Sequence, residues 1–580
     1  MNSFNIYIYI YIYIYIYIYI FNIVKFVSDP KCNAFCFVSP FYFWSCSFST
    51  GTKCIPKDMG YVLSSDSGYD DARVQFASQM GNKKESDFQL APDLVVFCKN
   101  DKDVVDAIHF ARNCGYKVSI RSGGHQYGGN SSCSANEFVQ TMQIDVSGLE
   151  TFTAPTYENP THVSLGVGLV SEQVIELLKP YNLTIPVGMC KSVGVGGHFQ
   201  TSSLGLLARS FGSGMDHVIL FRIALYDGRI ERVTAESNKD LYWAVLGGGA
   251  GSWGVILDYT FDAIKGGDYP HAKYGTYFWP YNSSLSKHVM TTAMSIMADA
   301  TGNIDLQTLV FIGYSDEMYA LGDTRPYISL AVIWTGVEHG ELTAAMFGKF
   351  IQPFLDISPP SPLSPGLRSM TLVDLIIGST RAFDFKPYKY YVHGLIVNAL
   401  NDSSEFIDRI VVELEERTLV PDTLFSLQFQ FYGGTGTGSQ LNRNGGKNAF
   451  PLRSILLNVD DWLFFKNDEQ SKMTRDRINR FRNDTSFFWN IGNRVTDSFM
   501  TKSTIDATTF ELEESWASYY PNKEWFQRLQ SINAATDPIN LFSNSLTIPL
   551  PKSSAPNSSD SMAPRLIVTL TVLSFILLYV

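Results

Sequence analysis

Arg121-Ser-Gly-Gly-His125-Gln-Tyr127 and Gly188-Met-Cys190-Lys-Ser-Val193-Gly194-Val-Gly196-Gly197-His198 are the two segments that decide how this chain folds and what it binds. Each places a reactive side chain, His125 or Cys190, beside a run of glycines. Glycine lets backbone N–H groups lie close to a bulky anionic ligand and accepts the positive φ that such loops need. An imidazole or a thiolate held there can bond covalently to the ligand. The pair therefore predicts one large cofactor with two attachment points.

The residues around the first segment predict alternating strands and helices. A buried strand over 93–97, a helix over 101–113 with an Asp cap and a strand over 116–120 lead directly into Arg121. Open α/β sheets bind ligands at such strand ends. Further along we expect strands at 138–145, 162–167 and 217–226, and a helix at 171–181.

A third glycine-rich loop, Gly247 to Gly254, follows the segment Asp240-Leu-Tyr-Trp-Ala-Val-Leu246. The dinucleotide pattern of the Rossmann fold is absent, because its third glycine would fall on Phe199 or on Ser171. No Gly-Lys-Ser/Thr follows any glycine run, so a P-loop is absent too. The three loops together predict a nucleotide site of another kind.

The second half of the chain predicts a sheet backed by helices. From 268 to about 505 glycine becomes rarer and the residues that contact substrate are hard to identify. Four aromatic residues stand out as candidates for stacking on a substrate: Phe278, Trp279, Tyr391 and Phe431. Expected strands are 274–278, 327–335, 391–400, 424–432 and 454–459, and expected helices are 286–297, 341–350, 404–416 and 470–483. A last helix over 523–534 is expected to return to the first domain.

Composition excludes several classes of protein. The 580 residues carry a formal net charge of −11 and no long Lys/Arg run, so the electrostatic footprint of a nucleic-acid-binding protein is missing. The spacing of the N-terminal cysteines does not fit a zinc site, and we expect no metal. Cys98 and Cys114 are expected at opposite ends of a βα unit, too far apart for a disulfide.

The two ends of the chain differ in kind. Residues 6–20 alternate Ile and Tyr, as an ATATAT repeat would encode, and we interpret 1–58 as translated non-coding sequence with the genuine start at Met59. A signal peptide or membrane anchor is the alternative, but it lacks a basic n-region. At the other end, the polar spacer 552–565 and the apolar tail 566–580 are typical of a GPI signal, with a tail-anchored helix as the alternative.

The tail and six Asn-x-Ser/Thr sequons predict the secretory pathway, with the protein secreted or held at the extracellular face of the plasma membrane. We expect a monomer.

The three loops resemble those of the berberine-bridge-enzyme-like flavoproteins, members of the vanillyl-alcohol-oxidase superfamily with a PCMH-type FAD domain. The ending Arg528-Leu…Asp537-Pro-x-Asn-Leu-Phe542 resembles the family's C-terminal segment. The resemblance implies an α+β fold with a two-part FAD-binding domain over 87–267. It also implies a substrate domain over 268–505 with an antiparallel sheet backed by helices, and a C-terminal segment over 506–550.

By the same resemblance, His125 attaches to the 8α-methyl carbon of the flavin and Cys190 to C6. His198 resembles a family histidine near the flavin N1/C2 locus, where a positive or donor group stabilises the reduced flavin. Tyr127 resembles an active-site tyrosine. Val193 leaves room for dioxygen beside the flavin, where leucine tends to close it. Further residues expected to contact FAD are Arg121, Ser122, Gly123, Gly124, Gly194, Gly196, Gly197, Gly249, Gly251 and Val255.

The general base is expected to be Tyr519, which aligns with a family tyrosine although Ser518 replaces the usual Asn; Tyr520 is the alternative. A phenol with an ordinary pKa of about 10 needs help to act as a base near neutral pH. Some members use a Gln or a carboxylate on a preceding strand. Asn458 and Asp460 lie roughly there, but neither could be assigned this role.

The resemblance predicts an FAD-dependent oxidase that takes hydride from an alcohol or a sugar carbon of a small molecule and reduces O2 to H2O2. Oxidative cyclisation or desaturation of a secondary metabolite is the alternative reaction. A catalytically silent surface flavoprotein is the alternative of another class.

Overall fold

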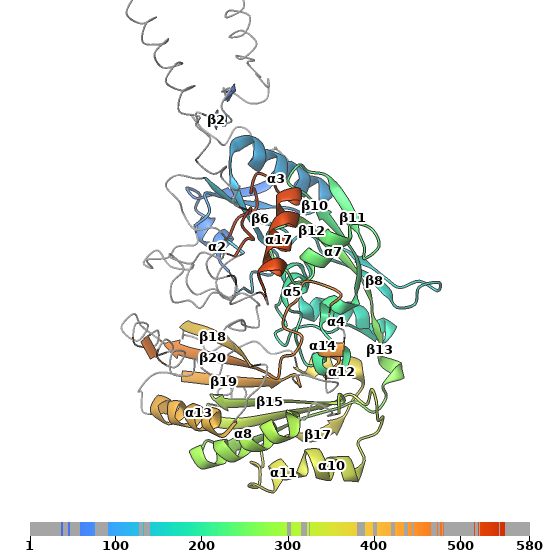
Figure 1. Cartoon of the computed structure of the whole chain (residues 1–580), viewed down its shortest axis with the longest axis vertical. Coiled ribbons are helices and arrows are strands. Elements are labelled where there is room, and N and C mark those ends of the chain that lie inside the picture. The colour runs from blue at the N-terminus through green and yellow to red at the C-terminus, as the bar shows by residue number, and fades with distance from the viewer. Residues whose placement is uncertain are drawn as a thin grey trace, which may run out of the picture.

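The structure, a computed structural model, describes residues 36–38, 44–46, 59–75, 91–126, 131–132, 140–298, 303–314, 322–323, 325–379, 389–397, 403–418, 424–433, 439–443, 446–465, 473, 476–477, 480, 516, 520, 522–544 and 546–551. Figure 1 shows two domains, one above the other along the long axis of the molecule. The Ile/Tyr repeat, the apolar tail and the predicted helix over 470–483 fall outside these ranges or nearly so. Within them no helix has both the length and the apolar character needed to cross a bilayer.

The first sheet has the order β3-β4-β6-β5, with three parallel strands and one antiparallel edge strand. Asn100 caps helix α3 by accepting a hydrogen bond from the Asp103 N–H, so the cap is one residue earlier than the predicted Asp101. Gly115, with φ of 76°, ends the helix in the left-handed conformation. The elements are β3 (Gly60–Leu63), α2 (Tyr69–Arg73), β4 (Leu94–Phe97), α3 (Asp101–Cys114), β5 (Lys117–Arg121) and β6 (Thr141–Asp145).

This domain begins upstream of the predicted boundary at residue 87. Strand β3 pairs with β4 along its full length, from Gly60 opposite Phe97 to Leu63 opposite Leu94. The buried Gln75 side chain donates a hydrogen bond to the Gln143 side chain at 3.1 Å. The region before 87 carries no strong periodicity, so a short edge strand there was not expected from the sequence.

The second sheet is antiparallel in the order β11-β10-β12-β8-β7 and packs beside the first in one continuous core. Its strands are β7 (Phe152–Thr153), β8 (His162–Gly166), β10 (Val218–Ala224), β11 (Ile230–Val233) and β12 (Val255–Asp262), with the pair β9 (Leu183–Thr184) and β13 (Ile264–Lys265) beside it. The helices are α4 (Ser171–Leu178), α5 (Val195–Thr201), α6 (Ala208–Phe211) and α7 (Lys239–Val245), with short 3-10 turns η2 (Lys179–Tyr181), η3 (Gly214–His217) and η4 (Gly266–Asp268). A separate short hairpin, β1 (Cys36–Val38) and β2 (Trp44–Cys46), lies near the N-terminus.

The second domain is a seven-stranded antiparallel sheet in the order β17-β14-β16-β15-β19-β20-β18. Figure 1 shows α8, α10, α11 and α13 on one face of this sheet, while α12, α14 and the first domain lie on the side of the other face. The strands are β14 (Lys273–Pro280), β15 (Leu306–Gly313), β16 (Tyr327–Trp334), β17 (Gly366–Ser369), β18 (Lys389–Val397), β19 (Leu424–Phe431) and β20 (Leu457–Phe465). The helices are α8 (Ser283–Met297), α10 (Ala344–Phe350), α11 (Gln352–Leu355), α12 (Leu372–Ser379), α13 (Ser403–Thr418) and α14 (Gln440–Arg443).

Side chains alternate between the two faces of this sheet, as strand geometry requires. On β19, Phe425, Leu427 and Phe429 pack into the core beneath α8 and α13. Gln428 and Gln430 lie on the opposite face, toward the first domain. The sheet therefore has an apolar side for its helices and a partly polar side for the site.

Two segments connect the domains. The segment 446–456 comes just before β20, and its Arg453 forms two hydrogen bonds of 2.8 Å with the Asp216 carboxylate of the first domain. Its Ala449 N–H donates to the carbonyls of Trp243 and Leu246. Phe450 lies so close to Gly247 that a Cβ added to Gly247 would clash with it. The second segment is α17 (Lys523–Thr536), which Figure 1 shows in red within the first domain, as predicted for a returning C-terminal helix.

Candidate active site

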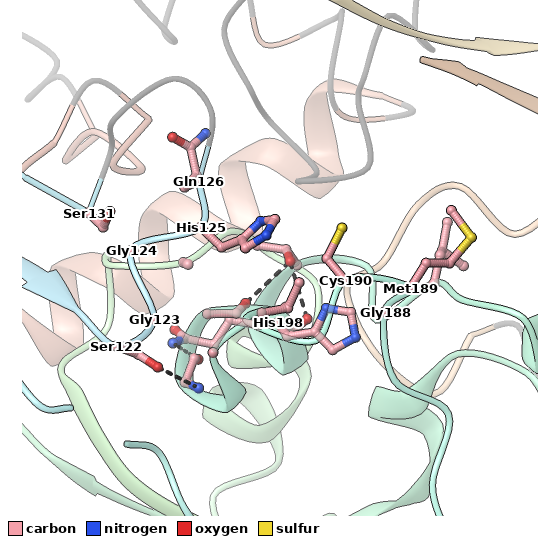
Figure 2. A pocket seen from close by; sticks show the side chains of 18 of the residues that line it. Ser122, Gly123, Gly124, His125, Gln126, Ser131, Gly188, Met189, Cys190 and His198 are labelled. Carbon is pink, nitrogen blue, oxygen red and sulfur yellow. Dashed lines mark hydrogen bonds between the residues drawn. The ribbon is translucent and has the colours of Figure 1, made fainter. Parts of the chain in front are cut away.

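A cavity of about 200 Å³ lies between the glycine loops of the first domain and the polar face of the seven-stranded sheet. The loop side is formed by residues of the two opening segments and of the third glycine loop, among them His125, Cys190, Val193, His198 and Gly251. Figure 2 shows the His125 ring and the Cys190 thiol projecting from separate loops into this space. The structure therefore brings together the two reactive side chains that stand far apart in the sequence.

The two glycine loops are held together by close backbone packing. A Cβ on Gly123 would lie 2.6 Å from the Gly194 nitrogen, and a Cβ on Gly194 would clash with Gly123 in turn. The Ser122 hydroxyl donates to the Val167 carbonyl at 2.6 Å and accepts from the Gly196 N–H at 3.2 Å. Gly123 and Gly194 thus hold the two loops together, and both also line the cavity, so the predicted contact with the cofactor stays a prediction.

His125 is poised to act as a nucleophile. Burial lowers its pKa from 6.5 to about 4, so the imidazole is neutral near pH 7 and one ring nitrogen keeps its lone pair. Cys190 is not in a disulfide, is partly exposed and lines the cavity. The neutral His125 imidazole thus has the form that attack on an electrophilic ring requires, and the Cys190 thiol would attack as its thiolate.

His198 on α5 is neutral as well. Burial, and to a smaller extent His125, lower its pKa to about 3. Its Nε2 atom has no hydrogen-bond partner among the described residues, and its ring is 3.2 Å from the position that a Cβ on Gly188 would take. Of the two roles expected from the sequence, a hydrogen-bonding group fits this environment and a cation does not.

The lowered pKa of His198 makes the free energy of unfolding depend on pH. His198 has a pKa of 6.5 when unfolded and about 3 when folded, so between these values the unfolded chain takes the proton first and stability falls as pH falls. His198 should lower the free energy of unfolding by about 1.4 kcal/mol for each pH unit between about pH 6 and pH 4. We expect His198→Gln to abolish this contribution. Urea unfolding of both proteins at the two pH values measures it. Equal pH dependence in the two proteins would show that His198 protonates normally in the fold.

Three predicted cofactor contacts lie behind the cavity wall. Arg121 pairs with the buried Asp145 carboxylate and donates to the Val74 carbonyl at 2.8 Å, which holds the end of β5 in place. Gly249, with φ of 107°, accepts a hydrogen bond from the Trp253 indole. Val255 is fully buried in β12. In this third loop the residues at the cavity are Ala250, Gly251 and Ile256.

Of the three tyrosines predicted to act in catalysis, the structure describes only Tyr520. Tyr127 and Tyr519 fall outside the described residues, so their roles stay predictions. Tyr520 is only 1% exposed, stacks on Phe526 and donates to the Gly248 carbonyl at 3.0 Å. It therefore belongs to the core and does not serve as the alternative base.

The substrate-facing wall was largely missed from the sequence. It is formed by residues on β14, β15, β16, β19 and β20, namely Tyr274, Leu309, Phe311, Ala331, Gln428, Gln430 and Trp462. Of the aromatic residues expected there, Trp279 and Phe431 face the helices, Phe278 packs on Tyr327, and the Tyr391 side chain is outside the described set. The alternation of Gln428 and Gln430 with Leu427 and Phe429 was the signal that could have identified the wall.

The residues at the cavity fit FAD. The position of a Cβ on Gly197 has no heavy atom within 4 Å, so the backbone there faces open space and can lie against a ligand. The unpartnered His198 Nε2 offers a hydrogen bond to a ring substituent. His125 and Cys190 line the same cavity as Gly197 and His198, opposite the wall formed by the sheet.

Residues 92–234 match the family model described as FAD binding domain. The chain is similar to Berberine bridge enzyme-like 18 of Arabidopsis thaliana, with 34% identity over 199 residues that cover 33% of this chain and 36% of the relative. The matched segment thus spans about a third of the curated relative's length.

Solved structures match over much more of the chain. BBE-like 1 of Physcomitrella patens superposes with a TM-score of 0.69 and 18% identity, covering 86% of this chain and 98% of that structure. A glucooligosaccharide oxidase of Acremonium strictum, whose structure concerns a 6-S-cysteinyl, 8α-N1-histidyl FAD, gives a TM-score of 0.66 and 18% identity, with coverages of 85% and 97%. These likenesses establish the predicted fold, an FAD-binding domain joined to an antiparallel-sheet domain.

Proposed function

Because the chain belongs to the berberine-bridge-enzyme-like FAD-linked oxidoreductases, we propose that it is an oxidase that removes hydride from an alcohol or carbohydrate carbon and reduces O2 to H2O2. We propose further that its FAD is bound covalently through both His125 and Cys190.

One observation carries this proposal: His125 and Cys190, 65 positions apart in the chain, line a single cavity. An imidazole and a thiol on two interlocked glycine loops match the histidyl and cysteinyl linkages of the FAD in the Acremonium strictum oxidase. Two bonds to one ring hold it rigidly, and such preorganisation lowers the entropy lost on reaching the transition state.

The roles of the chain's residues follow from their places. When bound, FAD supplies a two-electron acceptor for hydride and passes the electrons to O2. His125 and Cys190 fix the ring, and His198 offers it a neutral hydrogen-bonding group. Gln428, Gln430 and Trp462 form the wall opposite, where they orient the substrate. Tyr519 is proposed to take the hydroxyl proton.

A panel of oligosaccharides, phenolic alcohols and benzylisoquinoline alkaloids tests the reaction. We expect anaerobic bleaching of the flavin and H2O2 release with members of the first two groups. Turnover confined to alkaloids, with new C–C bonds or double bonds formed, would favour oxidative cyclisation or desaturation. No bleaching with any member would overturn the proposed function.

Val193 sits where it can control oxygen access. It lines the cavity, and its side chain is 3.6 Å from the position of a Cβ on Gly188, beside His198. We expect Val193→Leu to slow reoxidation of the reduced enzyme about tenfold or more, because an added methylene in a packed site displaces a small ligand. Stopped-flow mixing with O2 measures this rate. Flavin reduction by substrate should change little, and unchanged reoxidation would exclude the gating role.

The secretory route is also proposed, and Asn282 gives a local test of it. The side chain is exposed and caps α8, with its Oδ1 accepting a hydrogen bond from the Leu285 N–H at 3.0 Å. We expect the secreted protein to lose mass at Asn282 on treatment with peptide N-glycosidase. Asn282→Asp keeps the cap and Ser284→Ala keeps the asparagine, so each should remove the mass of the Asn282 glycan from the shift without a change in stability. A shift that persists in both variants would place the glycan elsewhere.

A further inference from the structure

A proline-rich segment between α11 and β17 repeats the triplet Ser-Pro-x three times, as Ser358-Pro-Pro, Ser361-Pro-Leu and Ser364-Pro-Gly. We call residues 358–365 the proline strip. It carries no ionisable side chain, and none of its residues lines the cavity. Figure 1 shows α11, the helix that precedes the strip, at the end of the second domain away from the first domain. The strip is therefore a feature separate from the candidate active site.

The serines of the strip attach it to strand β14. The Ser361 N–H donates to the Phe278 carbonyl at 2.7 Å, and the Ser364 hydroxyl accepts from the Phe278 N–H at 2.9 Å. The Trp279 indole N–H donates to the Ser358 carbonyl at 2.9 Å. Phe278 and Trp279 are only 3% and 1% exposed. The strip is thus held against the sheet at each of its three serines.

The prolines of the strip lie on the opposite side, in solvent. Pro359, Pro362 and Pro365, which occupy every third position, are exposed, and the Leu363 side chain is 57% exposed. A proline ring fixes its own φ near −65° and restricts the preceding residue to extended conformations. The exposed rings are therefore held in place by the backbone as well as by the serine contacts.

A turn divides the strip into an extended part and a corner. The Ser364 N–H donates to the Ser361 carbonyl at 2.9 Å, which closes a β-turn with Pro362 in its second position, where proline is favoured. Before this corner, Pro359 and Pro362 have the P-x-x-P spacing that aromatic-lined grooves bind. Leu363 follows directly and adds an aliphatic side chain to the two exposed rings.

The serine hydroxyls of the two later Ser-Pro pairs are engaged with the backbone. The Ser361 hydroxyl accepts from the Leu363 N–H at 3.3 Å, and the Ser364 hydroxyl lies 3.5 Å from the Phe278 carbonyl in addition to its bond with the Phe278 N–H. A partner that approaches the strip from solvent therefore meets pyrrolidine rings and Leu363, whereas these two hydroxyls face β14.

We propose that the proline strip docks a protein partner that has a groove lined by aromatic side chains, with Pro359, Pro362 and Leu363 as the anchors. Proline rings and a leucine side chain stack in such grooves, and an uncharged strip needs no ionic partner. Because the rings are already fixed, little conformational entropy is lost on binding. The inference goes beyond the proposed oxidase function and does not depend on it.

Titration of proline-binding modules with the full-length holoenzyme tests the proposal. The probes are a purified SH3 domain, a WW domain and an EVH1 domain, each labelled with nitrogen-15 and followed by NMR. We expect at least one module to bind through its aromatic groove. Joint replacement Pro359→Ala and Pro362→Ala should weaken that binding about tenfold or more, because two apolar contacts are lost. Binding by no module, or undiminished binding by the double variant, would overturn the proposal.

Pro160→Ala is the matched control, because Pro160 is also exposed but lies in the loop between β7 and β8 of the first domain. It should bind the module as the wild type does, and equal weakening by this variant would count against the strip. If the double variant does not fold, Leu363→Ser replaces it and should also weaken binding. Sedimentation velocity tests a second copy as the occupant: a wild-type dimer that the strip variant abolishes would overturn the proposed partner.

Discussion

Replacing His125 and Cys190 together by alanine is expected to release the flavin from the protein on acid precipitation and to lower turnover roughly 100-fold or more. Both side chains line the cavity, so under the proposed double attachment each single variant keeps one bond. Colour and absorbance of the pellet and the supernatant measure retention. The wild type and both single variants should hold the flavin in the pellet, and the double variant should not.

The single variants serve as controls for folding as well as for attachment. If flavin is released from the wild type by acid, neither bond is present and the double attachment is excluded. If release occurs already in one single variant, that residue carries the only bond.

Gly194→Ala should destabilise the protein by about 3 kcal/mol or more, which is a large part of a typical folding free energy. The backbone φ of Gly194 is −76°, a value any residue adopts, so the cost comes from contact and not from conformation. The new methyl group would clash with the Gly123 nitrogen and the Ser122 hydroxyl across the interlocked loops. Thermal or urea unfolding with cofactor occupancy measured in parallel gives the effect.

Gly197→Ala is the matched control, three residues along the same motif. A Cβ there meets nothing within 4 Å, and alanine is the better helix former, so stability without cofactor should hold or rise by up to about 1 kcal/mol. Its methyl group projects into the cavity, so flavin occupancy should fall. Equal stability of the two variants would refute the close packing of the loops.

The first domain could be predicted closely because its signals are local. Strands at 93–97 and 116–120 and the helix between them follow from caps, glycine and short apolar runs, and the structure places β4, α3 and β5 there. The order β11-β10-β12-β8-β7 depends on pairings between residues far apart in the chain, which no local pattern records. Strands β11 and β12 were missed for that reason.

The second domain was less predictable because its strands are buried on both faces. Strand β15 at 306–313 was missed, and β20 extends to 465 although its end was expected at 459. Buried strands often lose the polar alternation that marks a strand with one wet face. Strand β19 keeps it at Gln428 and Gln430, but the expectation went to aromatic residues, of which Phe278, Trp279 and Phe431 do not line the cavity. The loop side of the site is rich in glycine and reactive residues, and its predicted members His125, Cys190, Val193 and His198 all line the cavity.

The segment 446–456 has a consequence for protein engineering. It runs from the Phe450 contact on Gly247 through Arg453 to β20, which carries Trp462 and Asp460. A chimaera that exchanges the second domain between homologues receives Arg453 without its own Asp216. It also receives Phe450 without the Gly247 against which Phe450 packs. Successful grafts should therefore transfer Asp216 and the Gly247 turn together with the sheet, so the unit to exchange is larger than the second domain.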